Sequence, residues 1–461
     1  MMLPPVELRS IRTVDDPLVV VAGAEGLGWD EHVEVRLDGG AVRRGVVLEV
    51  DRGLAVVEVF AGTEGIGRGQ AGVAGSGAPM RVAVTEAWLG RVADGVGAPI
   101  DGGPPVVADA RREVRGAPIN PAARTAPEEA VVTGISAIDG LATLVRGQKL
   151  PIFSEAGLSH LELAIQIASQ AHVGGEPFRV VFAAMGVTNA DATAVRDGLE
   201  ARAGAGELVA FVNTVSDPVI ERIVTPRIAL TVAEHLAFEA GYHVLVVMAD
   251  MTSYAEAVRE VASARREIPT RRGYPGYLYS DLAALYERCG RIRGRAGSVT
   301  LVPVLTMPEG DITHPVPDLT GYITEGQLVL TRELAGRGVY PPLDALPSLS
   351  RLMRRGAGPA RTRDDHRDIA AQLHAALDHA RRVGDLAELL GREALSEGDR
   401  RYLRFAQAYE RDFLDQGAAE SRTLDDTLDR AWRAAAILPR RELTMVSEGQ
   451  LAVRYPSRTG G

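Results

Sequence analysis

The sequence has very little lysine and very little cysteine. Its 51 basic residues include one lysine, Lys149, so the other 50 are arginines (51 minus 1), and chemistry that needs a lysine ammonium must use that position. The single cysteine, Cys289, excludes an intrachain disulfide and a site built from several cysteines, and it fits a reducing compartment. The nine histidines show no HExxH or comparable ligand spacing, so no metal site is assigned.

Long apolar runs and a surplus of positive charge are also missing. The run at residues 244–249 has six apolar residues, well short of the roughly 18 that a membrane-spanning helix needs. Glu7, Asp15 and Asp16 come before the first apolar run, which is unlike a secretory signal. The net charge of -10 argues against a protein whose main task is to bind nucleic acid. We therefore expect a soluble chain that reaches a membrane only through partners.

Short alternating runs fill residues 1–75. At residues 33–37 apolar and charged side chains alternate, Gly39 and Gly40 offer a hairpin turn, and the alternation resumes at residues 46–50. Several short strands at this spacing predict an N-terminal β-barrel domain. The glycine-rich residues 62–77 are interpreted as a linker or turn cluster.

From residue 76 to 350, apolar runs alternate with helical patterns, and after 350 only helical patterns remain. Apolar runs of this kind are typical of strands buried on both faces, which predicts a mostly parallel sheet covered by helices. Ser396 and Asp399 resemble a capping box that opens a helix in the last part of the chain. The expected strands are residues 150–153, 179–185, 208–212, 244–249 and 299–305. We predict a multidomain fold, with a central α/β domain at 76–350 and a C-terminal α-helical domain at 351–461.

The junction at residues 150–161 has the strand, loop and helix context of a phosphate-binding loop. Such a loop needs glycines whose backbone amides turn toward phosphate, a lysine for the β/γ-phosphates and a hydroxyl for magnesium. Against the pattern GxxxxGK[ST], Ser154 and Ser159 stand at the glycine positions and His160 stands for the lysine. The segment is therefore either an ordinary strand-to-helix turn or a degenerate phosphate loop, 154–161. The residues of the degenerate loop are Ser154, Glu155, Gly157, Ser159 and His160.

The residues at two other strand ends favour the second interpretation, a degenerate phosphate loop. Asp250 ends the apolar run 244–249, the pattern that holds magnesium in phosphate-loop ATPases, so we interpret it as a relic metal-site carboxylate. Met185, Gly186 and Val187 stand where a base that activates water is expected, and none of their side chains takes up a proton. Tight binding of a magnesium nucleotide by this chain is not expected.

Eight segments in order along the chain match a known family. They are residues 134–139, 146–149, 217–227, 250–257, 271–277, 311–315, 318–327 and 347–353. On these segments the chain resembles the B subunit of the V-type and archaeal-type rotary ATPases, the non-catalytic, regulatory partner of a catalytic A subunit. The resemblance covers nearly the whole chain, and it implies the same order of β-barrel, phosphate-loop-type α/β domain and helical domain.

The resemblance also implies an assembly. Three A and three B subunits would form a ring, with central rotor stalk and peripheral stalk subunits as further partners, on the cytoplasmic side of the membrane. The complex would couple ATP synthesis or hydrolysis to proton or sodium transport. ATP or ADP with Mg²⁺ would bind at the interface with the A subunit, and the isolated chain would be non-catalytic, with no nucleotide held tightly.

Arg351, in the segment 347–353, matches the arginine with which the family reaches the nucleotide of a neighbouring subunit. A planar guanidinium can bridge two phosphate oxygens, which an ammonium does less well. The alternative is a salt-bridged surface arginine. Ser348 and Ser350 beside it, and Arg271 and Arg272 in a glycine- and proline-rich loop, are candidates for a supporting interface, although ion pairing within the chain would equally explain the two arginines.

Two other functions remain as alternatives. A self-sufficient hexameric ATPase would need a cation near the β/γ-phosphates, and residues 154–161 provide none of the usual kind. A ring-shaped nucleic-acid translocase would need a basic surface with aromatic side chains in the N-terminal barrel. Residues 1–75 contain only Trp29 and Phe60 as aromatics.

Overall fold

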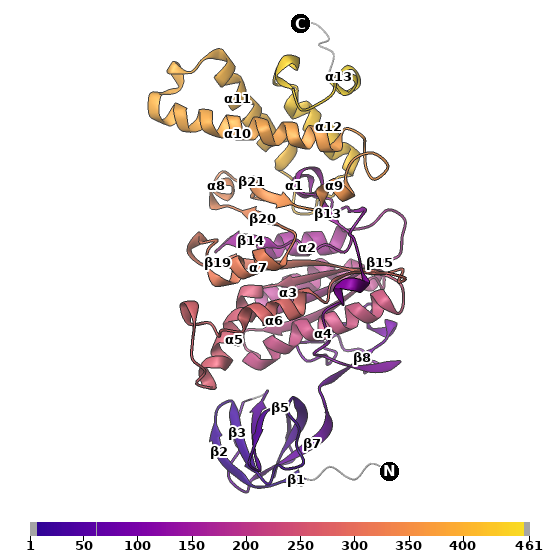
Figure 1. Ribbon diagram of the computed structural model, residues 1–461, viewed down its shortest axis with the longest axis vertical. Coiled ribbons are helices and arrows are strands. Elements are labelled where there is room, and N and C mark those ends of the chain that lie inside the picture. Colours follow the sequence, from indigo (N-terminus) through magenta and orange to yellow (C-terminus); the bar gives the residue numbers. More distant parts are fainter. Residues whose placement is uncertain (1–6, 61, 456–461) are drawn as a thin grey trace.

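The computed structural model describes residues 7–60 and 62–455. A β-barrel, a central α/β domain and a helical domain follow one another along the long axis of the molecule (Figure 1), so the predicted fold class is confirmed. Residues 1–6 and 456–461, at the outer ends of the predicted barrel and helical domains, lie outside the described residues. The exact domain boundaries stay predictions.

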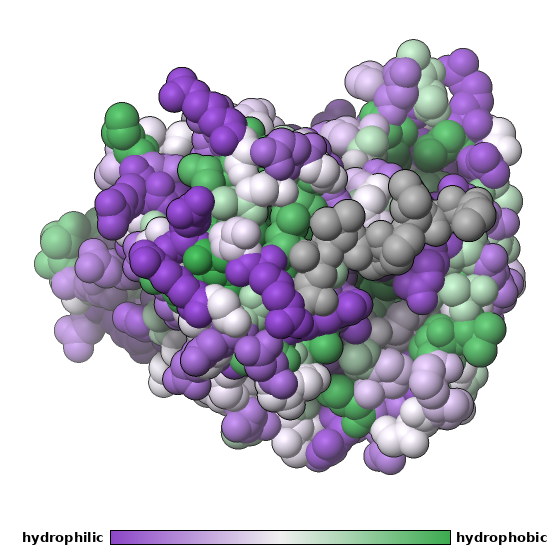
Figure 2. Space-filling model, turned by 90° about the horizontal axis from the view of Figure 1, so that it is seen from below, coloured by the Kyte–Doolittle hydropathy of each residue, from purple (hydrophilic) through white to green (hydrophobic). Residues whose placement is uncertain are grey.

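The barrel is one antiparallel sheet with the strand order β1-β7-β4-β5-β6-β3-β2. Side chains alternate between its two faces, so that Val33 and Val35 of β4 lie in the barrel core with Val57 of β6. The predicted hairpin at Gly39 and Gly40 is confirmed, because it joins the paired strands β4 and β5. Seen from the barrel end, hydrophilic side chains are interspersed with smaller hydrophobic groups (Figure 2). The strands are β1 Glu7–Leu8, β2 Ile11–Asp15, β3 Leu18–Ala22, β4 Glu31–Leu37, β5 Val42–Asp51, β6 Leu54–Val59 and β7 Ala71–Pro79.

The interpretation of residues 62–77 as a linker is wrong for its second half, because β7 lies between β1 and β4 in the barrel sheet. The glycines there permit a close approach. A Cβ on Gly75 would overlap Oε1 of Glu31, and the carboxylate of that glutamate accepts the backbone N–H groups of Gly28 and Gly77 at 2.7 Å each. Glycine therefore makes room for a buried carboxylate here, and does not break the strand.

The central sheet has the order β21-β20-β14-β19-β17-β15-β16-β9. The pairs from β20 to β9 are parallel, and β21 is an antiparallel edge. Four predicted strands are confirmed, and the fifth, predicted at 150–153, lies two residues further on, at Ile152–Glu155. Both faces are covered by helices. Its strands are β9 Val92–Asp94, β14 Ile152–Glu155, β15 Phe178–Val187, β16 Leu208–Thr214, β17 His243–Ala249, β19 Ser298–Met307, β20 Gly326–Leu330 and β21 Leu343–Ser350. The smaller strands are β8 Arg81–Val84, β10 Ala110–Glu113, β11 Arg124–Thr125, β12 Ala130–Val131, β13 Leu144–Val145 and β18 Gly290–Ile292.

Most helices of the central domain pack against this sheet through apolar residues. Those helices are α1 Ser136–Leu141, α2 His160–Gln170, α3 Asn189–Gly204, α4 Val219–Phe238, α5 Met251–Ala264, α6 Leu278–Tyr286, α7 Pro315–Ile323 and α8 Arg332–Gly336. In the described part of the chain, no helix is both long and apolar enough to cross a membrane.

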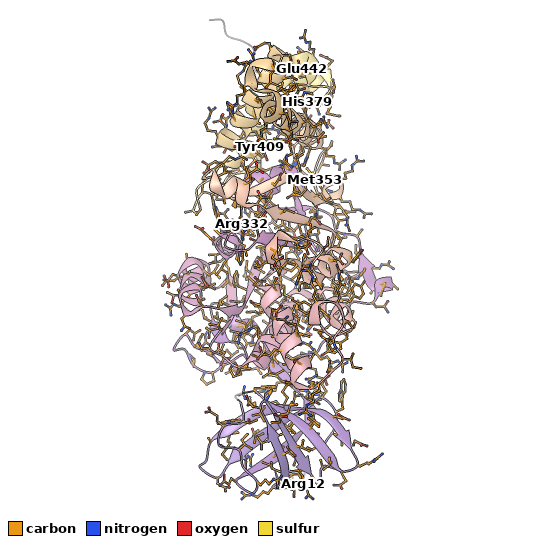
Figure 3. The ribbon with its side chains drawn as sticks, turned by 90° about the vertical axis from the view of Figure 1, so that its left-hand side faces the viewer. Arg12, Arg332, Met353, His379, Tyr409 and Glu442 are labelled. Carbon is orange, nitrogen blue, oxygen red and sulfur yellow. The ribbon has the colours of Figure 1, made fainter. Side chains whose placement is uncertain are left out.

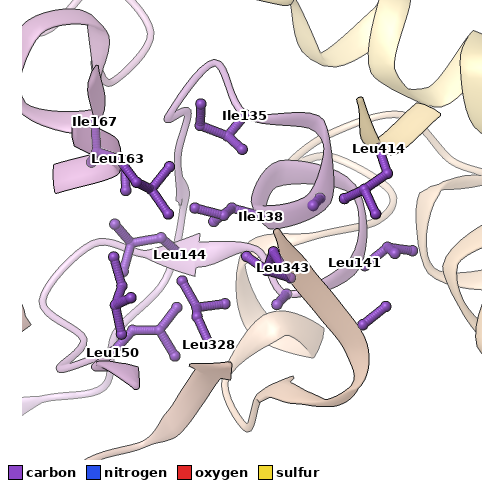
Figure 4. Close-up of a cluster of buried hydrophobic side chains, with 14 of the residues drawn as sticks. Ile135, Ile138, Leu141, Leu144, Leu150, Leu163, Ile167, Leu328, Leu343 and Leu414 are labelled. Carbon is purple, nitrogen blue, oxygen red and sulfur yellow. The ribbon is translucent and has the colours of Figure 1, made fainter. Parts of the chain in front are cut away.

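The helical domain continues the core of the central domain. Ile138 of α1, Leu343 of β21 and Leu414 belong to one buried cluster where the two domains meet (Figure 4). Met353 lies at this junction, below His379, Tyr409 and Glu442 of the helical domain and above Arg332 (Figure 3). The remaining helices are α9 Met353–Gly356, α10 His366–Leu390, α11 Glu397–Ala408, α12 Leu424–Ala435 and α13 Glu448–Arg454, with a π-helical turn at Tyr409–Leu414.

The capping box predicted at the start of α11 is confirmed. The side chain of Ser396 accepts the N–H of Asp399 at 3.1 Å, and the Asp399 carboxylate accepts the N–H of Ser396 at 3.3 Å. Ser396→Ala is therefore expected to lower the free energy of unfolding by about 1 kcal/mol in chemical denaturation. Ser280→Ala, which removes an exposed hydroxyl that donates to the Tyr277 carbonyl, is the control and should change it by less than about 0.5 kcal/mol. An equal effect of both variants would contradict the role of the cap.

Candidate functional site

The degenerate loop is shorter in the structure than its sequence pattern predicts. Ser154 and Glu155 continue β14, because this strand pairs on both sides, with β19 and with β20. His160 is the first residue of α2, so only residues 156–159 form the turn. Gly157 lies in this turn with a φ of +83° and nothing within 4 Å of a Cβ built on it, so the turn needs glycine for its backbone angle and not for space.

Polar groups at the loop are already engaged with one another. Ser154 is fully buried and its hydroxyl donates to the Glu155 carbonyl at 3.0 Å. The Glu155 carboxylate lies 3.6 Å from Nε of Arg332. The only glutamate of the loop is therefore paired with an arginine of the same chain, from the N-terminal end of α8.

His160 and Asp250 face each other across the loop, as a lysine and a metal-site carboxylate would. Nε2 of His160 lies 3.9 Å from Oδ2 of Asp250. The two Asp250 oxygens accept the N–H of Thr252 at 2.6 Å and the hydroxyl of Thr306 at 2.5 Å, and Asp250 caps α5. These residues do not fit a magnesium nucleotide, because both oxygens of the carboxylate already accept hydrogen bonds from the protein and an imidazole lies where the ammonium is needed.

A hollow of about 970 Å³ lies beside this pair. Met185 and Gly186 at the end of β15 line it, together with Ser253 of α5 and Ser421 of the helical domain. Gly186 has a φ of +65°, and a Cβ there would lie 2.8 Å from Nε of Arg222. The scaffold of a binding site is thus present, and in the part of the chain that the structure describes no group of three metal-ligating side chains accompanies it.

Lys149 has a different role from a phosphate-loop lysine. Its side chain is 4% exposed, and Nζ lies 2.7 Å from a carboxylate oxygen of Glu325 and 3.3 Å from one of Glu287. Its backbone N–H donates to the other Glu325 oxygen at 2.8 Å. Because Lys149 precedes β14 and the loop follows it, the only ammonium side chain lies at the opposite end of that strand from the loop.

Arg351 follows directly after β21 and is anchored by the segment that Lys149 holds. Its backbone N–H donates to the Glu325 carbonyl at 3.0 Å, and its Nη1 donates to the Thr324 carbonyl at 3.2 Å. Its side chain is exposed, and within residues 7–60 and 62–455 no carboxylate forms a salt bridge with it. The Thr324 carbonyl is thus the one acceptor of the guanidinium among the described residues, and its contact with a neighbouring subunit stays a prediction.

The two serines near Arg351 are engaged inside the chain. The Ser348 hydroxyl is buried, accepts the N–H of Val329 at 2.9 Å and donates to the Asp344 carbonyl at 2.5 Å. Ser350 accepts from the side-chain amide of Gln148 at 2.9 Å. Both serines hold the β20–β21 edge, and their direct role at an interface stays a prediction.

Arg271 and Arg272 lie in a short 3₁₀ turn, Arg271–Gly273. Arg271 pairs with Asp318 at 2.9 Å, and Arg272 pairs with Asp311 at 2.6 Å. Both are exposed ion pairs within the chain, as the alternative explanation expects. The structure does not bring these two arginines together with Arg351 in one cluster of contacts, and their role at an interface stays a prediction.

The groups that position Arg351 are not evident from the sequence alone. Glu325 and Thr324 supply its acceptors, and the Gln148 amide donates to the same Glu325 carbonyl at 2.9 Å. Their signal was present in the segment 146–149, where a glutamine and the only lysine precede a buried strand. The pairing of β14 with β20 then brings that segment to Glu325, a contact between residues about 176 positions apart.

The barrel gives little support to a nucleic-acid surface. Trp29 is 62% exposed, but the guanidinium of Arg115 lies 4.8 Å from its ring centroid. Phe60 is buried. The two aromatic residues of this domain therefore do not form a free stacking surface.

Comparisons with known proteins agree with the fold along the chain. A family model described as the nucleotide-binding domain of the ATP synthase alpha/beta family matches residues 134–350. Residues 14–71 match the beta-barrel domain of the same family, and residues 355–455 match the C-terminal domain of V and A type ATP synthase.

Individual relatives are similar over most of their length. The chain is 52% identical over 457 residues to the B subunit of the A-type ATP synthase of Aeropyrum pernix, and the match covers 99% of both chains. A solved structure described as a unique ATP synthase subunit NeqB from Nanoarcheaum equitans is 36% identical, with a TM-score of 0.70 over 86% of this chain and 95% of that one.

Proposed function

The chain belongs to the ATP synthase alpha/beta family, among the B subunits of the V- and A-type rotary enzymes, and we propose that it is the non-catalytic, regulatory member of the ring. In this proposal three copies alternate with three catalytic A subunits, and each copy completes the nucleotide site of a neighbouring A subunit. The observation that carries the proposal is the contrast between Arg351, which is exposed and has no carboxylate partner among the described residues, and a phosphate loop without a usable cation.

The chemistry follows from the geometry of Arg351. Its backbone and one guanidinium nitrogen are held by the carbonyls of Glu325 and Thr324, and in this proposal the remaining N–H groups donate to the phosphate oxygens. A fixed guanidinium placed near a transferring phosphoryl group stabilises the charge that develops on its oxygens. Mg²⁺ and the β/γ-phosphates would be held by the A subunit, because the residues around Asp250 do not fit them.

The remaining partners follow from the same proposal. Closure of the A-subunit site would be transmitted through this chain to the central rotor stalk, while peripheral stalk subunits hold the ring in place. The complex couples ATP synthesis or hydrolysis to proton or sodium transport, and this chain lies at the cytoplasmic face of the membrane through its partners.

The purified chain alone is expected to show no ATP turnover above background in a phosphate-release assay. Its loop has His160 and Leu161 where the lysine and the metal-binding hydroxyl are needed, and residues 185–187 provide no base. Asp250→Asn should leave that background unchanged, as should the control Asp311→Asn on an exposed ion pair. Lone-chain hydrolysis that Asp250→Asn abolishes and Asp311→Asn leaves intact would reject the proposal in favour of a self-sufficient ATPase.

A further inference from the structure

A second cavity, of about 240 Å³, lies where the barrel meets the central domain. Strands β5 and β6 form one wall, and α4 and α5 form the other. Most of the lining is apolar and includes Val47, Ile223 and Val261. This cavity is separate from the hollow at the degenerate loop, since the two share no lining residue.

A buried carboxylate faces this cavity. Ala55, Val57 and Val59 of β6 point into the barrel core, so alternation along the strand turns Glu58 outward, where it is buried between the barrel and the central domain and lines the cavity. Its Oε2 accepts from Nη2 of Arg265 on the far wall at 3.0 Å. Its Oε1 is buried and has no hydrogen-bond partner among the described residues.

An unpartnered buried oxygen of this kind is costly, and buried acceptors nearly always find a donor. The cavity beside Glu58 is where such a donor would be placed. Burial also raises the pKa of Glu58, against the lowering effect of Arg265. Arg265 already supplies the opposite charge at Oε2, so what Oε1 lacks is a hydrogen-bond donor.

The charges around the cavity are already balanced. Besides Glu58 with Arg265, Arg227 pairs with Asp281 at 2.6 Å and Arg115 lies 3.8 Å from Asp30. An added charge would disturb these pairs and would lose its own hydration on entry. The ligand chemistry that remains is an apolar body with a single hydrogen-bond donor.

We propose that this cavity binds a small neutral molecule with an aromatic or aliphatic body that donates one hydrogen bond to Oε1 of Glu58. Its volume lies just below the usual lower limit of ligand pockets, about 300 Å³, which restricts the ligand to one or two rings. Because its walls belong to two domains, a bound molecule stabilises the barrel against the central domain. This inference does not depend on the proposed function.

Indole and 1-methylindole are the matched probes, because the methyl group removes the only N–H donor and nearly preserves the shape. Calorimetry or ligand-observed NMR with the full chain should show indole binding about tenfold more tightly than 1-methylindole. Glu58→Leu should abolish this difference, whereas Glu58→Gln, which keeps an acceptor oxygen, should retain it.

A cavity-filling variant tests the place of binding. Val261→Phe, on the α5 wall, should abolish indole binding, and Val42→Phe, on the exposed side of β5, should leave it unchanged. Absence of indole binding to the wild-type chain, equal affinity for both probes, or unchanged binding in Val261→Phe would each overturn the proposal. If Val261→Phe does not fold, the probe pair on the wild-type chain and on Glu58→Gln still decides it.

Discussion

Replacement of Arg351 by alanine in the assembled complex should lower ATP turnover by about 10³-fold or more, the range seen when an arginine that reaches a transferring phosphoryl group is lost. Assembly should persist, because among residues 7–60 and 62–455 the guanidinium makes one hydrogen bond, to the Thr324 carbonyl. The measurement is steady-state ATP hydrolysis by the reconstituted complex, with size-exclusion chromatography as the readout of assembly.

Two further variants sharpen this test. Arg351→Lys keeps the charge but cannot bridge two phosphate oxygens, so it should recover only a part of the lost activity. Arg355→Ala removes another exposed arginine four residues away, on α9, and should leave turnover close to that of the wild type. Near-normal turnover of Arg351→Ala, or an equal loss in Arg355→Ala, would reject the proposed contact with the neighbour's nucleotide.

Replacement of Lys149 by methionine should have the second largest effect. The change removes the ammonium that lies between Glu325 and Glu287 and leaves two like charges side by side. A buried ion pair that loses one member typically costs about 3–5 kcal/mol, but the two glutamate side chains are 30% and 36% exposed. Water then compensates a part of the loss, so we expect a decrease of about 2 kcal/mol in the free energy of unfolding.

The same variant should also affect turnover in the complex. The Glu325 carbonyl accepts the backbone N–H of Arg351, so a shift of this segment moves the guanidinium, and a small displacement of a reacting group costs between about tenfold and about a hundredfold in rate. Arg81→Met is the control, since it breaks an exposed ion pair with Glu113 and should cost less than about 1 kcal/mol. A loss of stability without any loss of turnover would show that Lys149 supports the fold but not Arg351.

The central sheet could be predicted from sequence because its strands are buried on both faces. Every residue of such a strand faces an apolar environment, so a continuous apolar run such as 244–249 identifies the strand directly. The glycine-rich strand β7 could not be predicted in this way. Its Gly75 admits the Glu31 carboxylate, and that glutamate lies in another strand, about 44 residues earlier in the chain.

In the candidate site, too, the features formed by neighbouring residues could be predicted and those formed by distant residues could not. The loss of phosphate-loop chemistry is visible in a few neighbouring residues, because a loop that binds phosphate is local. The residues that position Arg351 are far apart in the sequence. The pairing of β14, β20 and β21 brings together residues near 148, near 325 and near 350. From the sequence, Arg351 could be identified only by its match to a family segment, whereas the carbonyls that accept its hydrogen bonds could be identified only from the strand pairing.

The burial of the only lysine has a practical consequence for chemical labelling. Amine-directed reagents need an accessible, uncharged amine, and the Lys149 ammonium is enclosed by two carboxylates. The only thiol is protected as well, because Cys289 is fully buried and burial raises its pKa to about 12. In the folded chain both side chains should resist modification, so the rates at which they become labelled report the opening of the central domain without any engineered probe.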